Sequence, residues 1–339
     1  MKRVIVIFFA ILLCVSCQSS DGLSFRTFSE KCEDSIVSEK ANTAELICNL
    51  TYPVGRSKAD GDIREWLNQA IMQEFAATHE NDDSPEIELS RHTDNIQEAF
   101  RDYSSQYYKW VKKEYSDEQG ELYPLQPFYI HFSARPVVDN ARYITYFVEA
   151  DIFFAGAHGT PHAYYRTYDK KLEQFVSCDM LVKKEHMEDV CRIVYAKALK
   201  KRQVLFNSQR LTTDFTDDYP CRDWSENKSE AIPKNKGLIP LQHIAILPQG
   251  IVVSYHPYQI GAFLEGDYHI LVPFKNIGEY LLQDYSKFLI IESMLSCIVI
   301  TCCFILCLLH TNHDTSAISP HLFPAQKSFL REKVSKYHY

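Results

Sequence analysis

Residues 144–154 read ITYFVEADIFF and decide the fold class of this 339-residue chain. Every second side chain in this stretch is apolar, and the same period of two occurs upstream, from Phe128 to Ala134. Successive side chains of a strand point to opposite faces, so this alternation predicts antiparallel strands with one buried face. The apolar positions are Ile144, Tyr146, Val148, Ala150, Ile152 and Phe154, and upstream Phe128, Ile130, Phe132 and Ala134.

The region before these strands has a helical period. A strand is predicted over residues 45–52, followed by a helix that Asp62 caps together with Glu65. A second capping box, Asp94 with Gln97, precedes another helix. Its aromatic side chains are interpreted as a stripe that faces the core rather than a surface that stacks on carbohydrate. Apolar residues recur at helical spacing at Ile63, Trp66, Leu67, Ala70, Ile71 and Phe75, and at Ile96, Phe100, Tyr103, Tyr107 and Trp110.

Strands and helices are mixed again downstream. A helix is predicted from Met187, a hairpin over residues 243–255, a strand over 268–273 and a short helix over 276–282. Residues 207–237 are polar and are predicted to be an exposed insertion. Because the elements do not alternate as βαβ units, the predicted fold is α+β. It consists of an antiparallel β-sheet of hairpins packed against several helices, with a smaller N-terminal strand-helix-helix region.

The first 17 residues have the pattern of an export signal. Lys2 and Arg3 precede an apolar run that is short for a bilayer span. The run ends at Ser16-Cys17, which is similar to a bacterial lipobox, so Cys17 is predicted to be the acylated first residue of the mature protein. An ordinary secretory signal or an uncleaved anchor would also export the chain. The sequence therefore predicts a protein exported and attached to a membrane of a bacterial cell envelope, with residues 18–44 as a polar tether.

A second apolar stretch, residues 288–309, lies near the other end and is predicted to be a membrane-spanning or membrane-embedded helix. If it spans, the basic residues of the tail 310–339 should be cytoplasmic. The alternatives are an apolar helix packed on the domain and a tail foreign to the folded unit. Lipid is thus a predicted partner through Cys17 and through residues 288–309.

The net charge of −8 disfavours a nucleic-acid binder, which needs clustered basic surface. The two ends carry net charges of +2 (residues 1–17) and +1 (residues 288–339), so the region between them is more acidic, at −11. This region holds an odd number of cysteines, which allows one or two disulfides of undetermined pairing. They are Cys32, Cys48, Cys178, Cys191 and Cys221.

Asp151, His158 and His162 are the one constellation that could carry metal chemistry. A carboxylate and two imidazoles can hold a catalytic zinc and leave a position open. The His-x-x-x-His spacing brings two rings together on a helix, but here Gly159 and Pro161 predict a turn. The alternatives are a metal-dependent hydrolase and a hairpin in which His158 bonds to nearby backbone. With no other catalytic motif present, the sequence predicts neither an enzyme nor a cofactor.

Two segments resemble a known domain. Residues 146–159, YFVEADIFFAGAHG, together with the following YYRTYDKKLEQFVSCDML, resemble its Gly-x-His-Gly hairpin and short helix. Residues 247–273, LPQGIVVSYHPYQIGAFLEGDYHILVP, resemble its closing motif. This bacterial extracytoplasmic domain of unknown function forms the outer part of RsiV-type lysozyme-sensing anti-sigma factors. It also occurs beside some peptidoglycan deacetylases and alone in envelope lipoproteins.

The resemblance implies a domain over residues 127–287, preceded by its smaller partner domain over residues 45–126. Only Lys2 and Arg3 precede the first apolar run, and deacetylase metal motifs are lacking, so the stand-alone lipoprotein is the most similar member type. The residues of the family motif mark a fold rather than an active site. By position they are Gly156, His158, Gly159, Tyr255, Pro257, Tyr258, Ile260 and Gly266.

These observations lead to three hypotheses. The first is an envelope-anchored, non-catalytic binding or sensing module, whose ligand the resemblance implies to be a lysozyme-like protein or wall glycan, that is, peptidoglycan. The acidic exported region would suit a basic partner. The second is the metal-dependent envelope hydrolase that uses Asp151, His158 and His162. The third is a structural lipoprotein.

Overall fold

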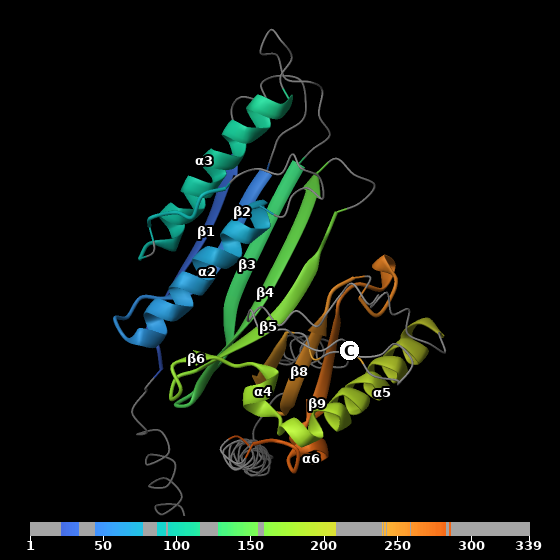
Figure 1. Cartoon of the computed structure of the whole chain (residues 1–339). Helices are drawn as coiled ribbons and strands as arrows, with labels where there is room; N and C mark the ends of the chain where they lie inside the picture. Colours follow the sequence, from blue (N-terminus) through green and yellow to red (C-terminus); the bar gives the residue numbers. More distant parts are fainter. Residues whose placement is uncertain are drawn as a thin grey trace, which may run out of the picture. The chain divides into compact units, whose positions relative to one another are not determined.

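The computed structural model describes two sheets and their helices (Figure 1). The predicted α+β class is confirmed. The described residues are 22–33, 45–76, 87–92, 94–115, 128–154, 159–207, 239, 241, 243–257, 259–282 and 285. The predicted export signal with Cys17, nearly all of the insertion 207–237, the stretch 288–309 and the tail lie outside them. Among the described helices, none has the length and apolarity to cross a bilayer.

The larger sheet has six strands in chain order. The strands are β1 (Phe25–Glu33), β2 (Glu45–Pro53), β3 (Phe128–Asp139), β4 (Tyr143–Phe154), β5 (His162–Asp169) and β6 (Gln174–Phe175). β2 and β3 run parallel and are connected through two helices, whereas the other neighbours are antiparallel. The alternating stretches therefore form the central hairpin β3–β4, as predicted.

Strand β1 corrects one prediction. Residues 18–44 were expected to form a tether, but β1 pairs with β2 along its whole length. Phe28 explains the difference, because its ring is buried and meets the Tyr52 ring edge-on at 6.0 Å. The predicted boundary between residues 126 and 127 falls between two neighbouring strands of this one sheet. The domain limits remain predictions.

Helices α2 (Lys58–Ala76) and α3 (Ile96–Tyr115) lie on the same face of this sheet (Figure 1). The prediction that Asp62 caps α2 is wrong. The helix begins four residues earlier, where Ser57 Oγ accepts from the Asp60 backbone N–H at 3.2 Å and the Ser57 N–H donates to Asp60 Oδ2 at 2.8 Å. This is a capping box with an aspartate at its third position. Asp62 instead accepts a hydrogen bond from the Tyr168 hydroxyl at 2.5 Å.

Aromatic side chains fill the first core, between the sheet and these two helices. Phe75 of α2 meets the rings of Phe100 and Tyr107 of α3 at 6.0 and 5.7 Å. Ile96, Phe100, Tyr103 and Tyr107 are fully buried, so the stripe predicted for this helix does face the core.

The C-terminal part builds a second core around a three-stranded antiparallel sheet. Its elements are α4 (Cys178–Leu181), the 3₁₀ helix η1 (Lys184–His186), α5 (Met187–Phe206), β7 (Ile244–Leu247), β8 (Gly250–Tyr255), the 3₁₀ helix η2 (Phe263–Glu265), β9 (Tyr268–Pro273) and α6 (Phe274–Ile277). The helix from Met187 and the hairpin agree with prediction. The helix expected over residues 276–282 is wrong in extent, because α6 ends at Ile277 and Leu281 forms a β-bridge with Val182.

The two sheets meet through buried threonines. Thr145 of β4 and Thr167 of β5 point away from α2 and α3, and both are fully buried. Their hydroxyls bond to the backbone of Ile246 in β7. The C-terminal sheet therefore covers part of the face of the larger sheet that the helices leave open.

A candidate ligand pocket on the open face of the sheet

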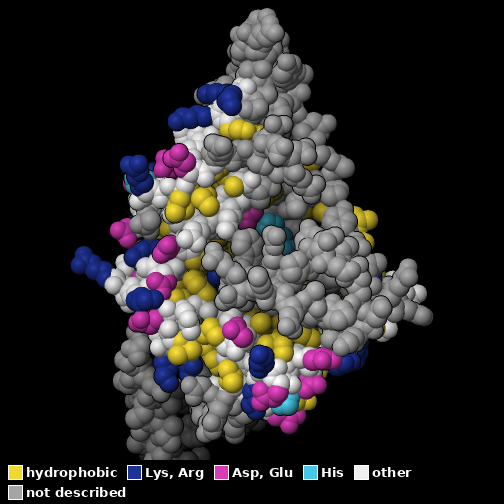
Figure 2. Space-filling model, in the orientation of Figure 1, with side chains coloured by type: hydrophobic (Ala, Val, Ile, Leu, Met, Phe, Trp, Pro, Cys, Tyr) yellow, Lys and Arg dark blue, Asp and Glu magenta, His cyan; other side chains and the backbone are white. Residues whose placement is uncertain are grey.

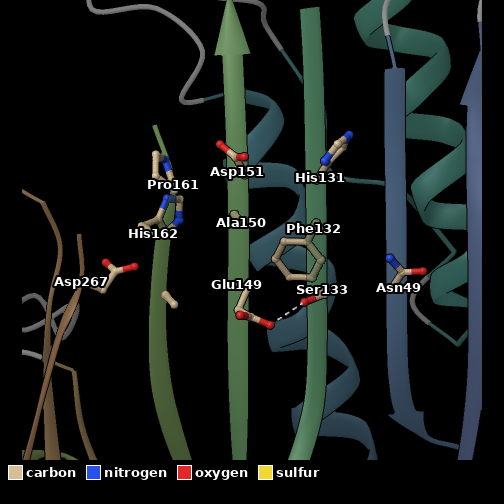
Figure 3. Close-up of a pocket in the computed structure, with 11 residues that line it drawn as sticks. Asn49, His131, Phe132, Ser133, Glu149, Ala150, Asp151, Pro161, His162 and Asp267 are labelled. Carbon is tan, nitrogen blue, oxygen red and sulfur yellow. Dashed lines mark hydrogen bonds between the residues drawn. The ribbon is translucent and has the colours of Figure 1, made fainter. Parts of the chain in front are cut away.

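A cavity of ≈ 300 Å³ lies on the larger sheet, beside the start of β5 (Figure 3). Carboxylates, imidazoles and small polar groups from four neighbouring strands line it, and the loop before β9 adds Asp267. The lining residues are Asn49, His131, Phe132, Ser133, Glu149, Ala150, Asp151, Pro161, His162, Ala163 and Asp267. Several strands thus contribute polar groups to one concave site, as is common in binding sites.

Strand register gathers these polar groups. Glu149 is directly opposite Ser133, and Asp151 is directly opposite His131. In turn Ser133 is paired with Asn49 on β2. Since side chains alternate along a strand, all five project on the side away from α2 and α3. The Ser133 hydroxyl donates to Glu149 at 3.4 Å (Figure 3).

Three rings border the cavity in a stack. Tyr129 lies against His131 with ring centroids 4.8 Å apart and planes inclined by 30°, and against Phe153 at 5.6 Å and 24°. The Tyr129 hydroxyl donates to Asp151 Oδ1 at 3.4 Å. Burial raises the pKa of Tyr129, and the charge of Asp151 raises it further. These half-buried rings form a stack beside the carboxylate of Asp151.

Glu45 fixes the outer side of the stack. It lies 2.6 Å from Lys31 Nζ and 2.8 Å from His131 Nε2. The hydrogen bond from Lys31 is the main reason why the pKa of Glu45 is lowered, and His131 lowers it further. Glu45 therefore stays ionised and orients the His131 ring.

Gly159 of the Gly-x-His-Gly motif packs directly against this site. A Cβ at this position would lie 2.8 Å from the Tyr129 hydroxyl, 3.0 Å from Asp151 Oδ1 and 3.2 Å from the Ile152 carbonyl oxygen. The next residue, Thr160, donates its N–H to that carbonyl at 2.6 Å. A larger residue at this position would displace these groups, so Gly159 shapes the pocket wall. Gly156 and His158 of the motif lie outside the described residues.

His162 lines the same cavity as Asp151, but its Nε2 lies 3.1 Å from Glu74 Oε1 of α2. Burial lowers the pKa of His162, but the hydrogen bond and the charge of Glu74 outweigh this effect, so the net shift is upward. Within the described part of the chain, no three His, Cys, Asp or Glu side chains are arranged to hold a metal ion. Because His158 is not described, the predicted metal site stays a prediction.

The imidazole of His256 packs against that of His162, and the imidazole of His243 packs against that of His256. His256 Nε2 is 3.2 Å from His243 Nε2, and His256 Nδ1 is 3.5 Å from Asp267 Oδ1. Burial lowers the pKa of His243 to about 3, with a further contribution from the charge of His256. His243 is therefore neutral near pH 7 and can accept a hydrogen bond from His256.

The second part of the family motif is largely structural. Tyr255 and Ile260 are fully buried in the second core, and Gly266 has a φ of 68°, which favours glycine. Pro257 lies in a turn, whereas Tyr258 lies outside the described residues. Sequence reasoning missed Glu149, His131 and Asp267. The polar positions that alternate with the apolar ones on β3 and β4 were the available signal for the first two.

A family model matches the part of the chain that builds the second core. Residues 178–275 match the DUF3298 family model. Its description is "Protein of unknown function (DUF3298)", and the match runs from α4 into α6. No curated protein matches the chain. The predicted resemblance to an extracytoplasmic domain of unknown function is supported at this level, and the link to RsiV-type anti-sigma factors stays a prediction.

Two crystal structures of DUF3298 proteins are similar to this chain. A member from Bacteroides fragilis is 13% identical, with a TM-score of 0.57 over 78% of this chain and 95% of that one. A DUF3298 family protein from Pseudomonas aeruginosa is 14% identical, with a TM-score of 0.49 over 78% and 96%. At this identity the first comparison shows a shared fold. Because that comparison covers more than residues 178–275, the fold that this chain shares with the Bacteroides fragilis protein includes strands of the larger sheet.

Proposed function

We propose that this chain is a non-catalytic binding module of the bacterial cell envelope whose ligand contacts the pocket on the larger sheet. The observation that carries the proposal is the stack of Phe153, Tyr129 and His131 beside the carboxylates of Asp151 and Glu149. Rings of this kind stack on the face of a guanidinium or a sugar, and carboxylates attract a cationic group. The proposed ligand is therefore a basic lysozyme-like protein or an amino sugar of peptidoglycan.

The charge that favours such a ligand is local. On the face shown in Figure 2, acidic and basic side chains are interspersed with apolar ones. At the pocket, Glu149, Asp151 and Asp267 supply the carboxylates that would attract a basic partner. Surface charges separated by more than about 8 Å are largely screened at physiological ionic strength, so nearby carboxylates dominate the interaction.

The test is a binding assay of the purified full-length chain in detergent with a basic lysozyme and with isolated peptidoglycan. We expect saturable binding to one of them that weakens as salt is added. Glu149→Gln with Asp151→Asn should reduce the affinity. The control Glu188→Gln changes an exposed carboxylate on α5, paired with Arg192, and should not. Folded protein that binds neither ligand, or a pocket variant that binds as well as the control, would refute the proposal.

A metal-dependent hydrolase is the second candidate, because Asp151 and His162 line one cavity and Gly159 lies beside Asp151. Elemental analysis of the purified chain tests it. Stoichiometric zinc that is lost in both His158→Ala and Asp151→Asn would favour the hydrolase over the binding module. A metal-free protein that takes up no added zinc would remove it.

Membrane attachment through Cys17 is a further part of the proposal, supported by the similarity of residues 14–17 to a lipobox. Cells fed a labelled fatty acid should incorporate the label into the wild-type chain but not into Cys17→Ser. Equal labelling of both chains would exclude acylation at this residue. Deletion of residues 288–339 tests the second attachment. If Cys17→Ser protein without this tail fractionates with the membrane as Cys17→Ser protein with the tail does, attachment through the tail is excluded.

A further inference from the structure

The two most exposed large apolar side chains of the described residues are close in sequence to the two partners of one salt bridge. Leu264 of η2 is 92% exposed, and Val204 near the end of α5 is 74% exposed. Leu205 and Phe206 follow with 46% and 43%. We call these four residues the apolar tip. Val204, Leu205 and Phe206 are consecutive at the end of α5, and contiguous exposed apolar surface marks an interaction site.

A buried salt bridge links α5 and η2, the two elements that carry the apolar tip. Arg202 of α5 donates two hydrogen bonds to Glu265 of η2, from Nε at 2.8 Å and from Nη2 at 2.7 Å. The two side chains are only 6% and 9% exposed, and the Tyr268 hydroxyl also donates to Glu265. This buried bidentate pair joins η2, one residue after Leu264, to α5, two residues before Val204. Asn207, in the left-handed conformation, ends α5 directly after Phe206.

Basic side chains lie one to two turns before the tip. Lys197 and Lys200 are on α5, and Lys201 Nζ lies over the Tyr268 ring, 5.4 Å from its centroid. The charge of Arg202 offsets that of Glu265. Asp267 is the carboxylate whose charge acts on Lys201. Apolar side chains that project beyond a cluster of lysines are the pattern by which surface helices insert into the interface of an anionic membrane.

We propose that the apolar tip, Val204, Leu205, Phe206 and Leu264, docks into the surface of an anionic lipid bilayer, with Lys197 and Lys200 against the headgroups. The complementarity of the lysines to anionic headgroups selects lipid over a second copy of the chain, whose surface at the tip carries the same positive charge. This inference goes beyond the proposed ligand pocket and depends on neither Cys17 nor residues 288–309.

The experiment places an indole on the tip of the full-length chain. Leu264→Trp protein is reconstituted in vesicles of brominated phosphatidylcholine with phosphatidylglycerol, and the fluorescence of the wild type, which has three tryptophans, is subtracted. The matched control is Leu172→Trp on the β5–β6 turn, where the leucine is 43% exposed. We expect bromine to quench the indole of Leu264→Trp and not that of the control. Equal quenching of both variants would overturn the proposal.

The charge component is tested in the same background. Omitting phosphatidylglycerol, or adding Lys197→Gln with Lys200→Gln, should cause a loss of quenching in Leu264→Trp. Unchanged quenching would overturn the assignment to anionic lipid.

Sedimentation of wild type and Leu264→Asp tests whether a second copy of the chain occupies the tip instead. A wild-type dimer that this substitution dissociates, without quenching in vesicles, would identify the tip as an interface between copies and overturn the proposal. Because Leu264 is exposed, circular dichroism should show that each variant folds.

Discussion

The hydroxyl of Thr145 donates a hydrogen bond to the carbonyl oxygen of Ile246 at 2.7 Å and so joins the two sheets. The Ile246 N–H donates to the Thr167 hydroxyl at 2.8 Å, and the two threonine hydroxyls are 2.7 Å apart. With Thr167 as donor to Thr145, the three bonds form a closed ring. Such a ring satisfies every buried polar group in it, and each bond polarises the next.

Thr145→Val should destabilise the protein although the side chain keeps its shape. The substitution leaves the Ile246 carbonyl oxygen without this donor and the Thr167 hydroxyl without an acceptor for its own proton, which should lower the free energy of unfolding by about 1–3 kcal/mol. Urea denaturation measures this change. Thr27→Val, at an exposed threonine pair on β1 and β2, should change it by less than about 0.5 kcal/mol. Equal effects of both substitutions would show that the ring contributes nothing specific.

Gly159→Ala should disturb the pocket. The new methyl group would lie 2.8 Å from the Tyr129 hydroxyl and 3.2 Å from the Ile152 carbonyl, so the pocket wall must move. We expect a loss of about 1–3 kcal/mol in stability, as for other overpacked sites, together with weaker ligand binding. Gly61→Ala is the control. Nothing lies within 4 Å of its Cβ, and alanine in helix α2 should raise stability by about 1 kcal/mol. A neutral Gly159→Ala would show that this approach can relax freely.

Acid should destabilise the protein through His269. Burial between Phe147 and Tyr165 lowers the pKa of His269 to about 4. The unfolded chain, with an ordinary histidine pKa of about 6.5, therefore binds a proton that the folded chain does not. Stability should be full above pH 6.5 and fall by about 1.4 kcal/mol per pH unit between about pH 6.5 and 4 for this residue.

His269→Gln isolates this contribution, since glutamine keeps a polar group near Ser254 but does not titrate. Urea unfolding at pH 7 and pH 5 should show a smaller loss of stability in the variant than in the wild type. His92→Gln is the control at an exposed histidine beside Glu98. Identical pH dependence of His269→Gln and the wild type would contradict the argument.

Glu265→Leu should strongly destabilise the C-terminal part. It leaves the Arg202 guanidinium charged and buried without its partner, a change that costs about 3–5 kcal/mol in other proteins. Adding Arg202→Met should recover most of the loss, because the paired replacement removes the uncompensated charge. Thermal and urea unfolding of the single and double variants provide the measurement, with Glu188→Leu as the exposed control. A double variant no more stable than Glu265→Leu would show that the charge is not the cause.

Alternation and helical spacing were enough to predict most of the elements. β3, β4, the hairpin β7–β8 and the two N-terminal helices could be read from the sequence because their buried faces repeat with periods of two and 3.6. Short-range signals were less reliable at the ends of elements. Ser57 and Asp60 form a capping box with an aspartate where glutamate is usual, so the start of α2 was placed at Asp62. β1 was missed because only Phe28 is strongly apolar on its buried face.

Part of the candidate site could likewise be predicted from the sequence, and part of it could not. The sequence by itself determined that Glu149 and Asp151 share one face of a strand and that a tight turn with Gly159 follows, because a strand's pleat fixes side-chain direction. Only the tertiary structure decided that His131 is opposite Asp151, that His162 pairs with Glu74 and that Asp267 reaches the same cavity. Those relationships depend on strand register and on contacts between residues far apart in the chain, which no local period encodes.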